Sequence, residues 1–560
     1  MKRLLFSCAI VFFVVCMFGA TAAFAQTDST KLFVNGSIYK DAGHKVNNLL
    51  VKNGVVAGHN VDPKKYPGAE IVDLKGAAAY PGFNDSHIHL QETGLVLYVG
   101  VDTTGCNGAD DLAKKIEEFI KNKPDVKVIT GAGFSVRDYN KWSLEDLAKL
   151  DEATGDRPAF IVDKLGHNAV MNTATMKLFT ITPETKVPLG GVMVMENGKL
   201  TGMLRESAMI LPSTKIFAMF SDKDVKAGAT IMANKWASMG YTGIVDLMGA
   251  PGIRIMHPQV FKEMEKEGAL PLRVNYCYTI FNLNDVDDAV KYMGKDTDLV
   301  RFVGCKIFVD GAYAGGQAWT SWKNNQGTHG LQEIYTDDKG GPELNLNRIV
   351  AKVEKYGMNM HYHVQGDKAI SAALDALDKV VAKNGKLKGV HTLIHLAFPT
   401  DAQLARIKKF KGHVVITTQP GFWPVERNSD YYYGDKAATC YPVKKMIDSG
   451  LSVGFSTDFS VSPPDYTPAT VVIGVAATGG GDPKNHPRVS IKEMVKGFSV
   501  GSNVTTGKKD VGTLDIGKKA DIVVFDQDLY SVPPEKFNAG NPKVLATYVS
   551  GQKAYEMKKP

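Results

Sequence analysis

The alternation of short apolar runs with helical segments constrains the fold of this chain more than any other feature. After residue 235, runs of strand length recur, and segments with helical spacing separate them. Eight strands are predicted, at 79–90, 240–248, 270–280, 300–310, 357–365, 391–397, 413–420 and 451–459. Seven of them alternate strictly with helices, as in α/β proteins with a parallel sheet. The count predicts a (β/α)8 TIM barrel.

Helix signals between these runs support the prediction. Apolar residues from Ile370 to Val381 keep one helical face, and Gly385 follows as a stop. Thr400 with Gln403, and Ser490 with Glu493, have the spacing of capping boxes. Helices are therefore expected to begin after Thr400 and Ser490.

Two regions lie outside the alternation. The segment at about 91–220 is too long for a crossover and carries its own helix and strand patterns, so it predicts an inserted lid subdomain. Both ends of the chain consist of short strands with Asn-Gly and Ser-Gly turns. We expect residues 26–80 and 500–560 to form one composite β-sandwich, and residues 81–499 to form the barrel with its insertion.

The first 25 residues have the pattern of a secretory signal peptide. Lys2 and Arg3 precede an apolar run, and Ala23-Phe24-Ala25 offers a small-residue cleavage site. A membrane anchor is the alternative. The cleaved signal predicts a bacterial protein that is periplasmic or secreted, with no stable membrane anchor after cleavage.

Composition indicates a globular protein. The 560 residues are 44% hydrophobic and 22% charged, which excludes disordered and collagen-like chains. The net charge of +7 is spread along the chain without a basic block, so nucleic acid is not an expected partner. Four cysteines remain after signal cleavage, and buried free thiols are favoured over two disulfides because a chain of this size does not need them.

Histidines gather near the carboxyl ends of three predicted strands, where barrel active sites are built. The first strand ends in Asp85-Ser86-His87-Ile88-His89, and alternation predicts that Asp85, His87 and His89 share one face. His361 and His363 share a face of the fifth strand, and His391 and His395 share one of the sixth. Core packing is the alternative for each pair, but such clustering favours a metal site.

Lys306 lies in the middle of the fourth predicted strand. Alternation places Cys305 and Ile307 toward the helices and Lys306 toward the barrel interior with Gly304 and Phe308. An interior lysine is costly unless it is neutralised, paired or modified. An ion pair with Asp310 is the simpler alternative.

Together these segments resemble the amidohydrolase superfamily, specifically its YtcJ-like amidohydrolase family 3. The resemblance covers almost all of the chain after residue 25. It rests on residues 81–89, the Lys306 strand with Asp310-Gly311, residues 363–367, His395, Gln419-Pro420, Ser456-Thr457-Asp458 and residues 517–524. Within the insertion, residues 166–168 and 202–206 resemble pocket and lid segments.

The resemblance implies a binuclear metal centre. His87, His89 and Asp458 would hold one ion, and His363 and His395 a second. Carboxylated Lys306 would bridge two Zn²⁺ ions, or other divalent first-row metals. Asp458 would also be the catalytic residue that takes a proton and passes it to the leaving group.

The chain departs from the family pattern on the sixth strand, where Ile394 precedes His395 and the family has Glu. This removes a carboxylate that would orient the histidine. His361 and His391 are rival ligands on their strands. Asp85 and Asp367 are candidates for orienting imidazoles, or ordinary strand-end and helix-cap residues.

The expected substrate is a small molecule. His167, Trp319 and Gln419 are candidate substrate-binding residues, and further aromatic residues that could line the pocket are Tyr139, Trp142, Trp322 and Phe422. An amide, cyclic amide or N-acyl compound is favoured, with hydrolysis of a C–N bond. Ester hydrolysis, deamination or isomerisation at the same site, and a non-catalytic periplasmic binding protein, are the alternatives. A second copy of the chain, forming a homodimer, is a further candidate partner.

Overall fold

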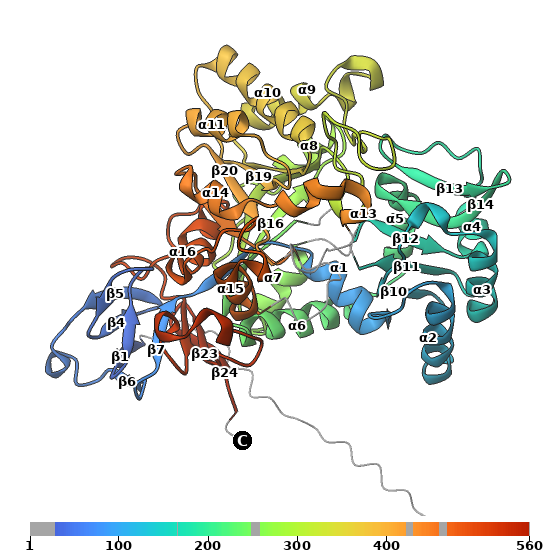
Figure 1. Ribbon diagram of the computed structural model, residues 1–560. Helices are drawn as coiled ribbons and strands as arrows, with labels where there is room; N and C mark the ends of the chain where they lie inside the picture. Colours follow the sequence, from blue (N-terminus) through green and yellow to red (C-terminus); the bar gives the residue numbers. More distant parts are fainter. Residues whose placement is uncertain (1–28, 165, 248–257, 422–428, 459–467, 559–560) are drawn as a thin grey trace, which may run out of the picture.

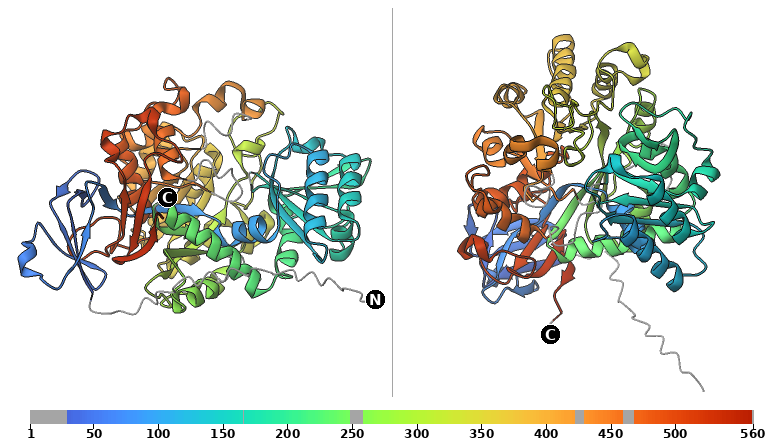
Figure 2. Two further views of the ribbon diagram at one scale, coloured as in Figure 1. Left: turned by 90° about the horizontal axis from the view of Figure 1, so that it is seen from below. Right: turned by 45° about the vertical axis from the view of Figure 1, so that its right-hand side comes forward.

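A computed structural model describes residues 29–558 apart from 165, 248–257, 422–428 and 459–467. The predicted signal peptide and Phe422 lie outside these residues. The chain forms a central barrel, with a subdomain from the insertion on one side and a β-sandwich from the two ends on the other (Figures 1 and 2).

The central sheet has eight parallel strands in chain order, which confirms the predicted barrel. They are β8 (Phe83–Ile88), β15 (Tyr241–Asp246), β16 (Arg273–Thr279), β17 (Val300–Phe308), β18 (Met360–Val364), β19 (His391–His395), β20 (Val414–Thr418) and β21 (Val453–Phe455). The two end strands meet where the Asp458 amide donates to the His87 carbonyl at 3.0 Å. The same bond places the residues after β21 beside the end of β8.

Helices surround this sheet. They are α6 (Asp222–Ser238), α7 (Gln259–Lys266), α8 (Asp285–Val290), α9 (Leu346–Lys355), α10 (Asp367–Asn384), α11 (Asp401–Lys409), α14 (Val443–Asp448), α15 (Ala469–Thr478) and α16 (Ile491–Lys496). Both expected capping boxes are present, at the starts of α11 and α16. Helix α10 ends at Gly385, which has a φ of 77°.

The insertion folds around a six-stranded mixed sheet in the order β13-β14-β12-β11-β10-β9. Its strands are β9 (Val101–Asp102), β10 (Ile129–Phe134), β11 (Ala159–Asp163), β12 (Asn168–Met171), β13 (Val192–Glu196) and β14 (Lys199–Arg205). Its helices are α2 (Ala109–Asn122), α3 (Leu144–Thr154), α4 (Thr173–Phe179) and α5 (Ile210–Phe217), and α1 (Leu90–Gly94) leads into it from the barrel.

Both ends of the chain contribute to the sandwich, as predicted. One sheet has the order β5-β4-β1-β6 and the other β24-β23-β22-β7-β2-β3. Their strands are β1 (Thr30–Val34), β2 (Ser37–Tyr39), β3 (Lys45–Val46), β4 (Leu49–Lys52), β5 (Val55–His59), β6 (Glu70–Asp73), β7 (Ala78–Pro81), β22 (Ile522–Phe525), β23 (Val544–Val549) and β24 (Gln552–Glu556). An apolar core of residues from both ends lies between the sheets.

The prediction of one strand at 79–90 is wrong, because two strands occupy this segment. β7 pairs with β22 in the sandwich, whereas β8 belongs to the barrel. Gly82 separates them and lies so close to β15 that a Cβ atom would come within 2.1 Å of the Thr242 hydroxyl. The chain therefore changes sheets at a residue without a side chain.

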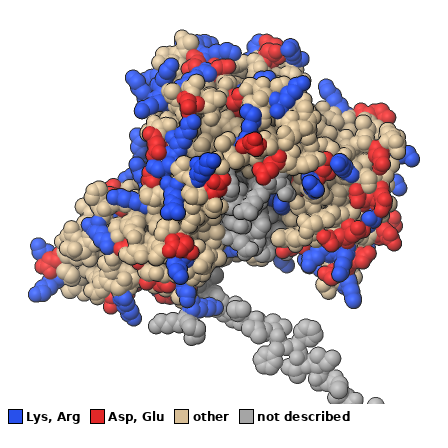
Figure 3. Space-filling view, viewed as in Figure 1, with Lys and Arg blue, Asp and Glu red and all other residues tan. Residues whose placement is uncertain are grey.

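The four cysteines outside the predicted signal peptide are buried and free, as expected. None of the helices in the described part of the chain combines the length and apolar character that crossing a bilayer requires. Basic and acidic side chains are interspersed over the face of the molecule seen in Figure 3.

A buried ion pair joins barrel and sandwich. The Arg273 guanidinium of β16 donates from Nε and Nη2 to the Asp521 carboxylate at 2.7 and 3.0 Å. Arg273→Met would leave Asp521 buried without its cation. We expect the free energy of unfolding to fall by about 3–5 kcal/mol in urea denaturation. Lys553→Met removes the exposed pair with Glu556 and should cost less than about 1 kcal/mol. Equal losses in both variants would contradict this assignment.

Candidate metal centre

His87 and His89 direct their rings toward the carboxylate of Asp458. His87 Nε2 lies 2.9 Å from Asp458 Oδ1, and His89 Nε2 lies 3.5 Å from the same oxygen. The two Nε2 atoms are 3.2 Å apart. Three potential metal-binding atoms therefore meet at the carboxyl end of β8, where the barrel closes.

The prediction that Asp85 shares a face with these histidines is wrong. The pairing of β8 with β15 shifts between Asp85 and Ile88, which indicates a β-bulge. Asp85 accepts hydrogen bonds from Trp236 Nε1 of α6 and from the amide and hydroxyl of Thr457. Asp85 thus holds the residue before Asp458 and makes no hydrogen bond to an imidazole within the described chain.

His363 and His395 form a second pair at the ends of β18 and β19. His395 Nε2 lies 3.0 Å from His363 Nδ1, and its Nδ1 lies 3.7 Å from Asp458 Oδ2. The ring centroids of His395 and His87 are 5.1 Å apart, so the two pairs are neighbours. His87, His395 and Asp458 offer ligand atoms that all lie within 4.8 Å of one another.

Alternation predicts that His391 and His395 share a face of the strand, and this prediction is wrong. His391 bonds to Tyr362 and to Glu354 of α9, at 2.9 and 2.8 Å, in the layer between strand and helix. His395 and Leu396 have φ values of 76° and 51°, so the chain leaves the strand geometry there. This change of direction takes the His395 ring to the metal centre.

Gln419 contacts the ring of His395. Gln419 Oε1 lies 2.9 Å from His395 Nδ1, while its Nε2 donates to the Ser456 hydroxyl at 2.8 Å. Ile394, which occupies the position of the missing Glu, packs in the small apolar cluster that contains Val245 and Val303. The sequence predicts that Gln419 binds substrate. In the structure it contacts His395, a candidate metal ligand, and orients its ring.

Lys306 is fully buried and points into the barrel, as predicted, while Cys305 and Ile307 belong to the core shared with the helices. Its Nζ lies 4.8 Å from the ring centroid of Phe308 and has no hydrogen-bond partner among the described residues. The alternative ion pair with Asp310 is not formed. Asp310 instead accepts from the backbone amides of Gln365, Gly366 and Trp319.

Burial sets the charge states of this cluster. It lowers the pKa of His395 to about 3 and that of His87 well below its usual value, and the charge of Lys306 adds to both effects. Burial also lowers the pKa of Lys306 to about 7. Burial alone would raise the pKa of Asp458, but the charge and hydrogen bond of His87 lower it well below its usual value. Neutral imidazoles around an ionised carboxylate are the forms that bind metal ions.

A cavity of about 400 Å³ lies between this cluster and the inserted subdomain. His89, Asp458 and His167 line it. His167 Nδ1 bonds to Glu206 at 2.5 Å, and its ring centroid lies 5.1 Å from that of His363. The insertion therefore delivers one predicted pocket residue directly to the metal centre.

The other predicted pocket residues are elsewhere. Trp319 packs against the Lys368 ammonium and is not among the described residues that line the cavity. Tyr139 and Trp142 belong to the core of the inserted subdomain, and Trp322 packs against Phe398 and Tyr433. Asp367 accepts from Ser321 and holds a loop.

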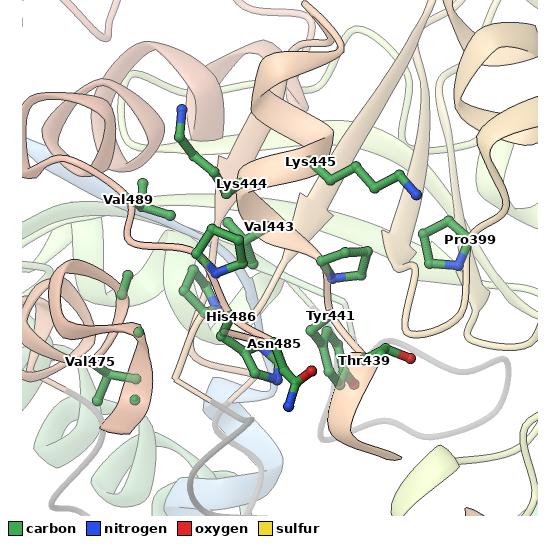
Figure 4. A pocket seen from close by; sticks show the side chains of 16 residues that line it. Pro399, Thr439, Tyr441, Val443, Lys444, Lys445, Val475, Asn485, His486 and Val489 are labelled. Atoms are coloured by element: carbon green, nitrogen blue, oxygen red, sulfur yellow. The ribbon is translucent and has the colours of Figure 1, made fainter. Parts of the chain in front are cut away.

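A second cavity, of about 330 Å³, lies between α14, α15 and residues 485–489 (Figure 4). None of the candidate metal ligands lines it. Lys444 and Lys445 at its rim are paired with acidic side chains. The chemistry of the molecule therefore centres on the first cavity.

The residues present fit a metal centre. His363 Nε2 and Lys306 Nζ are buried without a hydrogen-bond partner in the described part of the chain, and His87 and His89 direct their Nε2 atoms toward Asp458. Leaving buried polar atoms unpaired costs free energy, and imidazole with carboxylate is a donor set typical of zinc and related ions. His361 is also buried and unpaired, below His363 on β18.

Comparison with known proteins identifies the family of this chain. A model described as the amidohydrolase family matches residues 70–555. The chain belongs to the amidohydrolase family. The resemblance inferred from its motifs is thereby confirmed, and so is the prediction of a hydrolase from a metal-dependent family.

Three relatives illustrate the similarity. The N-substituted formamide deformylase of Arthrobacter pascens is 24% identical over 88% of this chain and 90% of its own length. The amidohydrolase-family protein YtcJ of Bacillus subtilis is 24% identical over 93% of this chain and 98% of its own. A metal-dependent hydrolase of Pyrococcus furiosus has a TM-score of 0.69 and 26% identity, covering 90% of this chain and all of that one.

Sequence reasoning did not single out Glu92 or Glu333, which line the cavity. Glu92 follows His89 by three residues in the first turn of α1, and this spacing is the sequence signal that could have identified it. Glu333 lies in a loop after β17, and no local pattern marks it.

His89→Ala should remove bound metal, because it deletes a ligand at the end of β8. We expect the metal content per chain, measured by mass spectrometry after dialysis against zinc and gel filtration, to fall by at least half. His44→Ala is the matched control, since this histidine is exposed on the sandwich and should leave the metal content unchanged. An undiminished metal content in His89→Ala would exclude it as a ligand.

Proposed function

We propose that this chain is an exported amidohydrolase that cleaves a C–N bond in a small amide, cyclic amide or N-acyl compound. One observation carries the proposal: four histidines and Asp458 come together at the ends of β8, β18, β19 and β21, and His89 and Asp458 of this group line the cavity. The Arthrobacter relative, named for deformylating N-substituted formamides, supports an amide as the substrate.

Two Zn²⁺ ions are the proposed cofactors, held by His87, His89, His363, His395, Asp458 and carboxylated Lys306. When bound, such ions would polarise a carbonyl group and lower the pKa of water. Other divalent first-row metals have compatible ligand preferences.

Lys306 is suited to carboxylation. Its pKa of about 7 leaves a large neutral fraction near neutral pH, and only the neutral amine attacks CO₂. The new N–C bond converts the amine to a carbamate, and one proton is released. The product is an anion that would replace a buried cation among neutral imidazoles.

Asp458 is the proposed catalytic residue. Its carboxylate is ionised and faces the cavity, so it can accept a proton from the attacking water and give it to the leaving nitrogen. Thr457 and the His87 carbonyl hold its backbone, which fixes the direction of the carboxylate.

Export to the periplasm or the medium is proposed from residues 1–25. We expect the mature chain to begin at Gln26, which amino-terminal sequencing of the protein from the periplasmic fraction or the medium would test. A mature chain that retains Met1 would overturn this part of the proposal.

Asp458→Asn should lower kcat by about 10²–10⁴-fold, because the amide cannot accept the proton. The zinc-loaded protein would be assayed on arylalkyl formamides, cyclic amides and matched esters. Asp125→Asn, at an exposed position, is the control and should keep full activity. Undiminished amide turnover by Asp458→Asn would refute its role. Turnover of esters alone would favour the ester-hydrolase alternative.

A further inference from the structure

The cavity beside the candidate metal centre is lined by both apolar and acidic side chains. Its far wall is apolar and includes Phe160, Phe217 and Phe281. Four acidic side chains line it: Glu92, Glu206, Glu333 and Asp458. His167 also lines it; burial disfavours its charged form, but the charge of Glu206 outweighs burial and raises the pKa of His167 to about 9, so these two side chains form an ion pair. No lysine or arginine is among the described residues of the lining.

Two of these acids are already engaged by the protein. Asp458 faces His87 and His89 in the metal centre. Glu206 bonds to His167 through Oε2 and accepts the Ala312 amide through Oε1 at 2.8 Å. Neither carboxylate is therefore available as a separate contact for a bound molecule.

Glu333 and Glu92 are differently placed. Glu333 is partly buried; its Oε2 contacts Ser207, and its buried Oε1 has no partner in the described part of the chain. The Glu92 carboxylate forms no hydrogen bond or ion pair with another described residue, although α1 holds it in the cavity wall. The buried, unpaired Oε1 of Glu333 points to a group that a ligand brings. The Glu92 carboxylate is partly exposed and lines the same cavity, where it can contact such a group.

We propose that the cavity takes a substrate that combines an apolar body with a positively charged nitrogen, and that Glu92 receives this nitrogen. The proposal rests on the proposed function and specifies its substrate class. A carboxylate in a poorly hydrated cavity attracts a cation more strongly than in water, while a second carboxylate is repelled. N-acyl amino acids, which carry a carboxylate, are thereby disfavoured.

The apolar wall sets the rest of the substrate. Arylalkyl groups gain free energy by leaving water for a surface of phenylalanine side chains, and a cavity of about 400 Å³ suits a small molecule. Glu92 follows His89 by three residues, so the charged nitrogen and the scissile bond would be close together. An amide of a small diamine with an aryl substituent has this arrangement.

The binding test uses ions that coordinate metals poorly. Calorimetry would measure the affinity of the zinc-loaded protein for trimethyl(2-phenylethyl)ammonium and for 2-phenylethanesulfonate. We expect the cation to bind at least about tenfold more tightly, and Glu92→Gln to weaken cation binding about tenfold. Glu117→Gln, at an exposed position of α2, is the matched control. Tighter binding of the sulfonate, or equal cation affinity in Glu92→Gln and Glu117→Gln, would overturn the proposal.

Turnover separates this proposal from the proposed function. The ratio of kcat/KM for an aminoalkyl aryl formamide to that for its carboxyalkyl analogue should exceed tenfold and should fall in Glu92→Gln. If no amide is hydrolysed but the cation still binds through Glu92, the proposed function fails and the cation site stands. If amides are hydrolysed with no preference for the amine, the cation site fails and the hydrolase stands.

Discussion

The structure depends on one partly buried carboxylate at the closure of the barrel. Asp458 lies where β21 meets β8, and its amide donates to the carbonyl of His87, whose ring contacts its side chain. Closing the sheet and assembling the metal ligands are therefore the same event. A carboxylate that is largely withdrawn from water is costly unless positive charge compensates it. Burial depresses the pKa values of His87, His363 and His395, so these three imidazoles contribute little positive charge.

Surrounding polar groups position two of the candidate ligands, Asp458 and His395. Asp85 holds Thr457, and Gln419 holds His395. Glu206 reaches from the inserted subdomain to orient His167 and also accepts the Ala312 amide of the loop after β17. The insertion is thus tied to the barrel through the rim of the active cavity, and it supplies much of the apolar wall.

Much of the fold and of the candidate site was predictable from the sequence. The periodicity of apolar residues predicts the barrel, and the histidines at the carboxyl ends of its strands predict the candidate ligands. The errors share a physical cause: strict alternation fails where the backbone leaves regular strand geometry. A bulge after Asp85 and positive φ at His395 both reverse the direction of side chains. Gly304, with a φ of 124°, lies at another register shift in β17. Contacts between distant segments, such as Glu333 with Ser207, leave no local pattern.

The proposed metal centre can be tested by anomalous diffraction at the zinc absorption edge, from crystals grown with zinc and bicarbonate. We expect two zinc peaks, one beside His87 and His89 and one beside His363 and His395, with a carbamate on Lys306 between them. A single peak with an unmodified Lys306 would contradict the bridged pair. The absence of any peak at these histidines would contradict the metal centre itself.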